Sequence, residues 1–353
     1  MYATTGIPMT TPAKQLAGRT LDGGWRVLGP APRKIGATGG SFSEGYIVED
    51  ARGRKGFLKA LDYSRALKSP DPARALQALT EAYNFERDVL KKCRDSNMDR
   101  VVVAITDGTV EVWGQPVQYL IFELADGDVR SQASTERRFD LAYALRSLHH
   151  VATGLLQLHQ ENIAHQDVKP SNVLAFAEAK LSKVADLGRA AYRGHIPPHE
   201  EYPIPGDPAY APPELLYGYV DPDWNRRRFG CDAYLMGSMI VFFFTGAGTT
   251  PLIRTGLREG HSWEHWAATY EEVLPYIRDA FGQVIDVLKE NVHESVRAEL
   301  VTAVRELCEP HPALRGHPRS RAGRGNPYSL ERYVSLFDLL ARRVELGLIK
   351  LPR

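Results

Sequence analysis

The sequence predicts an α+β protein with two lobes, a small β-rich N-terminal lobe and a larger, mainly helical C-terminal lobe. Residues 25–124 contain mostly short β-type runs, whereas long helical runs dominate after residue 125. A block of strands followed by a block of helices is typical of α+β domains. The length of 353 residues suits two lobes of ordinary size.

The individual elements follow from local patterns of apolar residues. Short apolar runs bounded by polar residues or Gly predict strands at residues 25–28, 45–49, 56–61, 101–105 and 119–122. One amphipathic helix interrupts these strands after residue 75. Apolar residues at helical spacing predict helices at residues 141–159, 230–244, 270–289, 292–307 and 330–346.

Three parts are therefore expected along the chain. Residues 1–20 are rich in Thr, Pro, Gly and Ala and lack periodicity, which predicts a flexible N-terminal tail. Residues 21–124 form the expected N-lobe. Residues 125–353 form the expected C-lobe, which includes the C-terminal helix.

Composition excludes several classes of protein. With 43% apolar and 25% charged residues the chain is not intrinsically disordered, and its net charge of +1 does not favour a nucleic-acid or membrane-surface partner. The longest purely apolar run, residues 239–244, is too short for a membrane span, and the N-terminus has no apolar core typical of a secretion signal. Three widely separated cysteines fit a reducing compartment, so we expect a cytoplasmic protein.

Four polar residues between positions 163 and 188 carry the strongest functional signal. Asp167, Lys169 and Asn172 fall in one loop after an apolar helix, and Asp186 follows a short strand-like run. A β-hairpin between the two loops would return both to one edge of a sheet. Two carboxylates, an amide oxygen and an ammonium suit phosphoryl transfer, in which oxygen ligands hold Mg²⁺ and a cation neutralises charge on the phosphate.

A second pair of charged residues lies in the predicted N-lobe. Glu86 falls in the middle of an apolar helix face, and that face is formed by Leu76, Leu79, Tyr83 and Leu90. A carboxylate on a buried face is unfavourable unless a cation meets it. Lys59, inside a predicted strand, is the expected partner.

The pattern HxDxKxxN followed by DxG resembles the catalytic core of the eukaryotic-type protein kinases. The resemblance covers about residues 36–315. It implies a two-lobed protein-kinase-like fold and an ATP-dependent Ser/Thr kinase that uses Mg²⁺, with Mn²⁺ as an alternative. The Ala- and Arg-rich composition favours a prokaryotic source.

The resemblance also implies a role for each residue of the two groups. Asp167 would accept or orient the hydroxyl proton of a protein substrate, and Lys169 would stabilise the transferring γ-phosphoryl group. Asn172 and Asp186 would ligate the metal. Lys59, held by Glu86, would position the α- and β-phosphates. Lys169 is similar to the Ser/Thr-specific branch, which predicts transfer to Ser or Thr.

The expected nucleotide-binding residues match the family less regularly. Gly36, Gly39 and Gly40 resemble the phosphate-covering Gly-rich loop, although their spacing differs from GxGxxG. One residue is inserted, and Ser43 to Gly45 occupy the positions where the family has its third Gly and a Val. Phe57 replaces the small Ala that usually lies against adenine.

The predicted strand at residues 119–122 leads into a segment that resembles the kinase hinge. Phe122 would guard the back of the nucleotide pocket. The backbone at Glu123, Leu124 and Ala125 would hydrogen-bond the adenine edge.

Three more features resemble kinase scaffold motifs. Glu214 is expected to pair with Arg315, and Asp232 is expected to bind backbone N–H groups of the catalytic loop.

Two further features bear on the substrate. Asp207 stands where the Ser/Thr branch usually has Thr. The triplet at residues 226–228 is expected to be a solvated basic loop rather than a site for acidic substrates.

Regulation is expected to differ from that of many kinases. Gln166 replaces an Arg that commonly binds an activation-segment phosphate, and an uncharged amide cannot form that ion pair. Residues 187–213 contain no Ser or Thr. We therefore expect activity that does not depend on Ser/Thr phosphorylation of this segment.

Two other functions are compatible with the same residues. The irregular Gly-rich loop and Phe57 would suit a pseudokinase that acts as a binding or scaffold module. A kinase-like small-molecule phosphotransferase would share the two aspartates and Asn172, but such enzymes generally lack the segment that includes Glu214.

Overall fold

The computed structural model describes residues 11–32, 42–135 and 140–348. The chain forms two compact units. The first comprises Met1–Ser96 and Val102–Ala125, and the second comprises Asn97–Val101 and Asp126–Arg353. The first unit contains an antiparallel sheet and the second is mainly helical, so the expected α+β organisation is confirmed.

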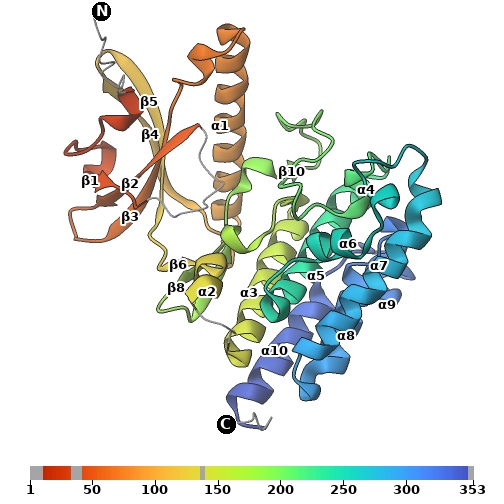
Figure 1. Cartoon of the computed structure of the whole chain (residues 1–353). Helices are drawn as coiled ribbons and strands as arrows, with labels where there is room; N and C mark the ends of the chain where they lie inside the picture. The colour runs from red at the N-terminus through yellow and green to blue at the C-terminus, as the bar shows by residue number, and fades with distance from the viewer. Residues whose placement is uncertain (1–10, 33–41, 136–139, 349–353) are drawn as a thin grey trace, which may run out of the picture. The chain divides into compact units, whose positions relative to one another are not determined.

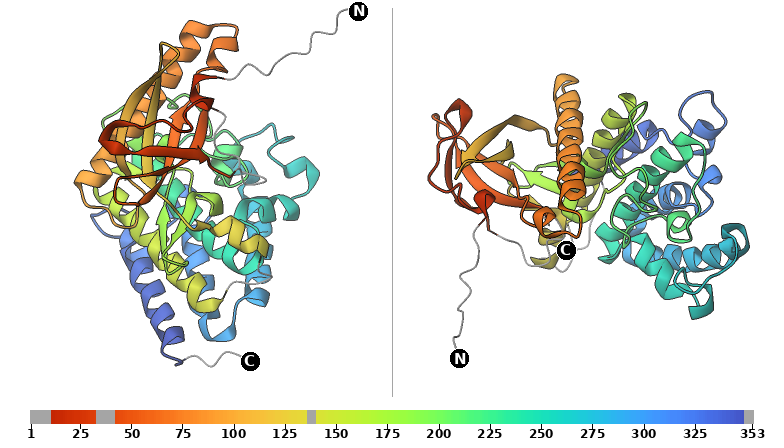
Figure 2. Two further views of the ribbon diagram at one scale, coloured as in Figure 1. Left: turned by 90° about the vertical axis from the view of Figure 1, so that its left-hand side faces the viewer. Right: turned by 90° about the horizontal axis from the view of Figure 1, so that it is seen from above.

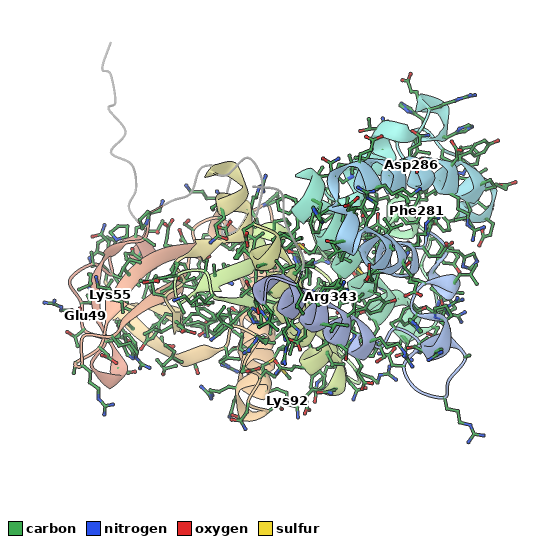
Figure 3. All side chains as sticks on the ribbon, turned by 90° about the horizontal axis from the view of Figure 1, so that it is seen from below. Glu49, Lys55, Lys92, Phe281, Asp286 and Arg343 are labelled. Carbon is green, nitrogen blue, oxygen red and sulfur yellow. The ribbon has the colours of Figure 1, made fainter. Side chains whose placement is uncertain are left out.

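The first unit is built on a five-stranded sheet of order β1-β2-β3-β5-β4 (Figure 1). Its strands are β1 (Arg26–Pro30), β2 (Ser43–Glu49), β3 (Lys55–Leu61), β4 (Ala104–Val112) and β5 (Gln115–Glu123). Neighbouring strands pair antiparallel throughout. In the β2–β3 hairpin Glu49 lies opposite Lys55, and Figure 3 labels both side chains.

The helix α1 (Pro72–Asp95) packs against β4 of the same unit. Asp71 caps the helix by accepting a hydrogen bond from the Arg74 N–H, and Pro72 occupies the first turn, where its missing N–H is tolerated. Tyr83, Glu86 and Leu90 are buried on the inner face of α1, whereas Leu76 and Leu79 are only half-buried. The predicted apolar face is therefore buried mainly in its C-terminal half.

The predicted flexible tail is wrong for residues 11–20. Ala13 and Leu16 are buried in the same apolar cluster as Leu58 and Ile121 of the sheet. The Tyr46 hydroxyl also donates a 2.6 Å hydrogen bond to the Ala13 carbonyl. Sequence periodicity missed this packing because the buried residues are unevenly spaced between Pro and Gly. Residues 1–10 lie outside the described part of the chain.

One predicted strand also needs correction. Residues 101–105 were expected to form a strand, but β4 begins at Ala104 and continues to Val112. Val101 instead forms an isolated bridge with Val184. The strand is difficult to recognise from the sequence because it contains Asp107 and Gly108, and both residue types are depleted in strands.

The second unit begins with two small sheets and two helices. One sheet has the order β6-β8-β9, and the other pairs β10 with β7. The strands are β6 (Gly127–Asp128), β7 (Ile163–Ala164), β8 (Val173–Phe176), β9 (Leu181–Val184) and β10 (Ala191–Tyr192). The helices are α2 (Val129–Thr135) and α3 (Leu141–Gln160), and the Asp140 side chain caps α3.

The almost entirely buried α5 (Gly230–Thr245) packs against α3, α6 (Thr249–Gly256), α7 (Tyr270–Asn291) and α8 (Glu294–Leu307). The unit also contains α4 (Pro213–Leu216), α9 (Pro318–Arg321) and α10 (Glu331–Glu345). The final helix packs along α3 (Figure 2). On α7, Phe281 is buried and Asp286 is exposed (Figure 3). The five long helices of this unit lie within a few residues of their predicted bounds.

Candidate active site

The first unit contains the predicted ion pair between Lys59 and Glu86. The Lys59 Nζ atom lies 2.8 Å from Oε1 and 2.9 Å from Oε2 of Glu86. Lys59 lies in β3, a central strand of the sheet, and Glu86 lies on the inner face of α1. Pairing with both oxygens explains how a carboxylate is tolerated on this buried helix face. The structure thus brings together two residues that are 27 positions apart in sequence.

Gly45 and Phe57 fit each other closely in the same unit. A Cβ atom at position 45 would lie 2.9 Å from Cε2 and 3.0 Å from Cζ of the Phe57 ring. The ring therefore occupies space that a side chain at position 45 would need. Gly45 in β2 and Phe57 in β3 both depart from the family pattern. The two departures are linked, because the large Phe57 ring fits only where position 45 has no side chain.

The hinge residues predicted from sequence lie at the end of β5 and beyond. Phe122 is buried and pairs with Phe57 across the β3–β5 ladder, whereas Glu123 is exposed and Ala125 is half-buried. The predicted glycines Gly36, Gly39 and Gly40 lie outside the described residues.

In the second unit, Asp232 anchors the loop that carries the predicted catalytic residues. Its carboxylate accepts hydrogen bonds from the backbone N–H groups of His165 (2.8 Å) and Gln166 (2.7 Å). The Nε2 atom of His159 lies 2.9 Å from the same carboxylate. Asp232 is fully buried, so these partners replace the water that its charge has lost. The loop is thereby held in one conformation, in which Gln166 has the left-handed φ of 64°.

Asp167 and Asn172 contact each other inside this loop. The Asn172 Nδ2 group donates to the backbone oxygen of Asp167 at 2.9 Å and to its Oδ2 atom at 3.0 Å. A short 3₁₀ turn at Pro170–Asn172 brings the amide back to the aspartate. The side-chain oxygen of Asn172 is then the atom of this amide that suits a hard metal ion.

Lys169 pairs with two carboxylates. Its Nζ atom lies 3.1 Å from Oδ2 of Asp167 and 3.2 Å from Oδ2 of Asp207. The backbone N–H of Asp207 also donates to Oδ1 of Asp167 at 2.8 Å. Asp207 therefore adds a second negative charge beside the predicted catalytic ammonium, an arrangement that the sequence motif alone did not reveal.

The electrostatic environment raises the pKa of both members of the Asp167–Lys169 pair. Burial raises the pKa of the Asp167 carboxyl, which Lys169 opposes and the charge of Asp186 reinforces. Burial acts to lower the pKa of Lys169, but the carboxylates of Asp167 and Asp207 outweigh it and the pKa rises. A carboxylate with a raised pKa is a stronger base, which suits proton acceptance.

Asp186 follows the β8–β9 hairpin, as the sequence predicted. The hairpin returns the chain to the catalytic loop, where the Ala185 N–H donates to the Asn172 carbonyl at 2.8 Å. The His165 ring contacts the Ala185 carbonyl at 3.0 Å. Asp186 itself has a left-handed backbone (φ 66°, ψ 76°). Such a conformation is unfavourable for a residue with a Cβ and persists only where the surrounding structure holds it.

The side-chain oxygens of Asn172 and Asp186 suit a metal ion that binds together with a phosphate-bearing substrate. Among the described residues there is no group of three or more His, Cys, Asp or Glu side chains that could hold a metal ion. Asn172 and Asp186 offer oxygen ligands from two adjoining turns. Mg²⁺ is commonly held by one or two such protein ligands together with phosphate oxygens and water, so the residues present fit this ion.

The predicted scaffold pair of Glu214 and Arg315 forms inside the second unit. The guanidinium donates to both carboxylate oxygens, at 2.6 and 2.8 Å, and Arg315 is 0% exposed. Carbonyl oxygens of Glu309 and Gly230 accept further hydrogen bonds from the same group. This pair fixes the start of α4 against the loop that precedes α9.

The solvated basic loop predicted at residues 226–228 is wrong for its last member. Arg228 is only 2% exposed and donates to Gln166 and Glu200. Arg226 instead pairs with Asp221 and is partly exposed. Three consecutive arginines give no periodic signal from which the buried one could be identified.

No single helix of the described residues is long and apolar enough to cross a membrane. One bent pair, Asn225–Thr245 with Thr249–Gly256 at 78°, meets the length and composition requirement only when the two helices are taken together.

Sequence comparison places these features in a known family. Residues 33–315 match the protein kinase domain. The chain is similar to CBL-interacting serine/threonine-protein kinase 7 of Arabidopsis thaliana, with 27% identity over 249 residues, 69% of this chain and 50% of that protein.

Two further relatives show shorter similarity. Aurora/IPL1-related protein kinase 2 of Caenorhabditis briggsae is 30% identical over 135 residues, 38% of this chain and 41% of that protein. Serine/threonine-protein kinase atg1 of Dictyostelium discoideum is 28% identical over 169 residues, 46% of this chain and 24% of that protein. The aligned parts thus span half or less of these relatives. The family-model match covers most of the chain, and the chain therefore belongs to the protein kinase family.

Proposed function

We propose that the chain is an ATP- and Mg²⁺-dependent protein kinase that transfers the γ-phosphoryl group to Ser or Thr hydroxyls of a protein substrate. The observation that carries this proposal is the grouping of Asp167, Lys169 and Asn172, held in place by the buried Asp232. The names of the relatives support protein phosphorylation, and Lys169 supports the Ser/Thr acceptor.

Each residue has a defined task in this proposal. Asp167, with its raised pKa, accepts or orients the proton of the attacking hydroxyl. Lys169 neutralises charge that develops on the transferring phosphoryl group. Asn172 and Asp186 hold Mg²⁺, which when bound neutralises phosphate charge and fixes the orientation of the triphosphate.

The first unit positions the nucleotide. Lys59, oriented by Glu86, binds the α- and β-phosphates. The sequence resemblance assigns Gly36, Gly39 and Gly40, which lie outside the described residues, to the same phosphates. Phe122, Glu123 and Ala125 border the adenine.

A radiolabel assay tests the proposal. The wild-type protein is incubated with Mg²⁺, γ-labelled ATP and separate peptide mixtures that offer Ser, Thr or Tyr, and labelled amino acids are identified after hydrolysis. We expect label on Ser and Thr, and a fall of at least about 10³-fold in Asp167→Asn and Asp186→Asn. Asp286→Asn is the matched control, since this exposed acid lies on α7 (Figure 3) and pairs with Lys289, three residues later on the same helix.

The other outcomes identify the alternative functions. Absence of label from the wild type and every acceptor, with ATP binding retained, would indicate a pseudokinase scaffold. Label on kanamycin or a sugar but on no peptide would indicate a small-molecule phosphotransferase. Label on Tyr alone would refute the proposed acceptor.

A further inference from the structure

Residues 187–213, here called the activation segment, are tied to the rest of the second unit through Glu200. One carboxylate oxygen of Glu200 accepts a 2.8 Å hydrogen bond from Nη1 of Arg227, and the other pairs with Nη2 of Arg228 at 2.5 Å. Arg227 also donates to the backbone oxygen of Glu200 at 3.2 Å. A single carboxylate in the activation segment thus pairs with two guanidinium groups.

Arg228 continues this connection to the catalytic loop. Its Nη1 atom donates to Oε1 of Gln166 at 2.5 Å. The amide nitrogen of Gln166 in turn donates to the Arg189 carbonyl of the activation segment at 2.9 Å. Gln166 directly precedes Asp167, so the chain of contacts leads from Glu200 to the residue next to the proposed base.

The local backbone explains why neighbouring arginines have different partners. Residues Asn225–Phe229 form a π-helical turn directly before α5, and the Gly230 N–H donates back to the Asn225 carbonyl. Successive side chains on this turn point in different directions. Arg226 pairs with Asp221 near the surface, whereas Arg228 turns inward and is almost fully buried.

Charge in the network is distributed differently from the family pattern. At position 166, where many kinases have the Arg that binds a segment phosphate, this chain has an uncharged amide. The cation is supplied instead by Arg228, 62 residues later in sequence. The activation segment has no Ser or Thr to phosphorylate, and Glu200 provides a carboxylate that needs no modification.

His199 does not add to the positive charge at neutral pH. Burial lowers its pKa to about 4, with further contributions from Arg189 and Arg228. Glu200 therefore balances guanidinium groups rather than a neighbouring imidazolium. Arg228 is buried, so its guanidinium depends on partners within the protein. If the Glu200 carboxylate were removed, the guanidinium would lose this ion pair and keep the hydrogen bond to Oε1 of Gln166.

We propose that Glu200 serves as a permanent anion that holds the activation segment on the catalytic loop through Arg228 and Gln166, in the role that a phosphate plays in many related enzymes. Glu200 and Arg228 are then positioning residues for Asp167. This inference rests on the proposed kinase function. It assigns the segment a conformation that is competent without phosphorylation.

Glu200→Gln tests the proposal, since it removes the charge and keeps the size of the side chain. Glu200→Asp keeps the charge and serves as the conservative variant. Glu201→Gln is the matched control, because Glu201 is the exposed neighbour. Arg226→Gln controls for loss of an arginine from the same turn. Melting curves establish that each variant is folded.

Two independent measurements are made on the full chain. Hydrogen exchange of peptides from residues 187–213 reports whether the segment stays docked, and steady-state kinetics on a Ser/Thr peptide mixture report catalysis. For Glu200→Gln we expect roughly tenfold faster exchange and a roughly tenfold lower kcat, since hydrogen bonds between charged groups are lost. KM for ATP should change by no more than about twofold, and both controls should match the wild type within about twofold.

The outcomes separate this proposal from the proposed function. Recovery of most of kcat and protection in Glu200→Asp, and full wild-type activity after phosphatase treatment, support the permanent anion. Unchanged exchange in Glu200→Gln, or loss of wild-type activity on phosphatase treatment, would overturn it. If the wild type transfers no phosphate at all, the kinase function fails, and hydrogen exchange alone still decides whether Glu200 holds the segment.

Discussion

Gly45 and Phe57 should behave as one unit when they are mutated. Gly45→Val introduces a Cβ atom 2.9–3.0 Å from two carbons of the Phe57 ring, whereas ordinary contacts lie at 3.4–4 Å. The ring must shift by about half an ångström or more, and overpacking of this kind costs about 1–3 kcal/mol. Phe57→Ala removes the obstacle. The double variant should therefore recover most of the stability that Gly45→Val loses.

Urea unfolding of the wild type, both single variants and the double variant measures this coupling. We expect a coupling free energy of about 1–3 kcal/mol, well above the roughly 0.5 kcal/mol found for independent sites. Calorimetric titration with ATP follows the same four proteins. Gly45→Val should weaken ATP binding about tenfold or more by displacing the ring, and the double variant should bind within about threefold of the wild type.

Additive effects on stability would refute this reasoning, since they would mean that the ring does not respond to a side chain at position 45. A double variant that stays as weak in ATP binding as Gly45→Val would show that the ring does not transmit the effect. Gly29→Val is the matched control, because no atom lies within 4 Å of a Cβ atom placed at position 29. Gly53→Val is unsuitable, because Gly53 has a left-handed φ of 78° that a Val would not adopt without strain.

Three further predictions concern the second unit. Glu214→Gln should lower the free energy of unfolding by about 3–5 kcal/mol in urea melts, because the fully buried Arg315 loses its anion, and Glu214→Leu combined with Arg315→Met should recover much of the loss. Burial lowers the pKa of His150 to about 4, so the free energy of unfolding should fall as the pH drops from 6.5 to 4. In urea melts, the loss between pH 7.5 and 4.5 should be about 2–3 kcal/mol larger for the wild type than for His150→Gln. Lys169→Met should move the acidic limb of the kcat–pH profile to higher pH, since the ammonium that lowers the pKa of Asp167 is removed; an unmoved limb would contradict Asp167 as the titrating group.

The features best predicted from sequence are those that short motifs specify locally. Asp167, Lys169 and Asn172 lie within six residues of one another, so a single tight loop is enough to bring them together. Glu86 was detectable because a charge on an apolar helix face demands a cation, and Lys59 meets it in the structure. The long helices were also predictable, since their apolar faces repeat over many turns.

Features that depend on tertiary packing were not predictable from the same patterns. The partners of Arg228 lie 28 and 62 residues away, and nothing in a run of three arginines indicates which one is buried. Residues 11–20 bury side chains without regular spacing, and so they resemble a tail. Asp207 was noticed as a substitution, but its sharing of Lys169 with Asp167 depends on how the activation segment returns to the catalytic loop.

The packing of residues 11–25 within the first unit has a consequence for synthesis. Leu16 and Trp25 complete an apolar cluster with Val117, Tyr119 and Ile121, which the ribosome adds about a hundred residues later. At about 5–20 residues per second, roughly 5–20 s pass before these β5 residues are added, although the cluster members in β2 and β3 follow much sooner. During that interval the apolar cluster around residues 11–25 lacks its β5 members, so the first unit cannot finish folding before residue 121 has been synthesised.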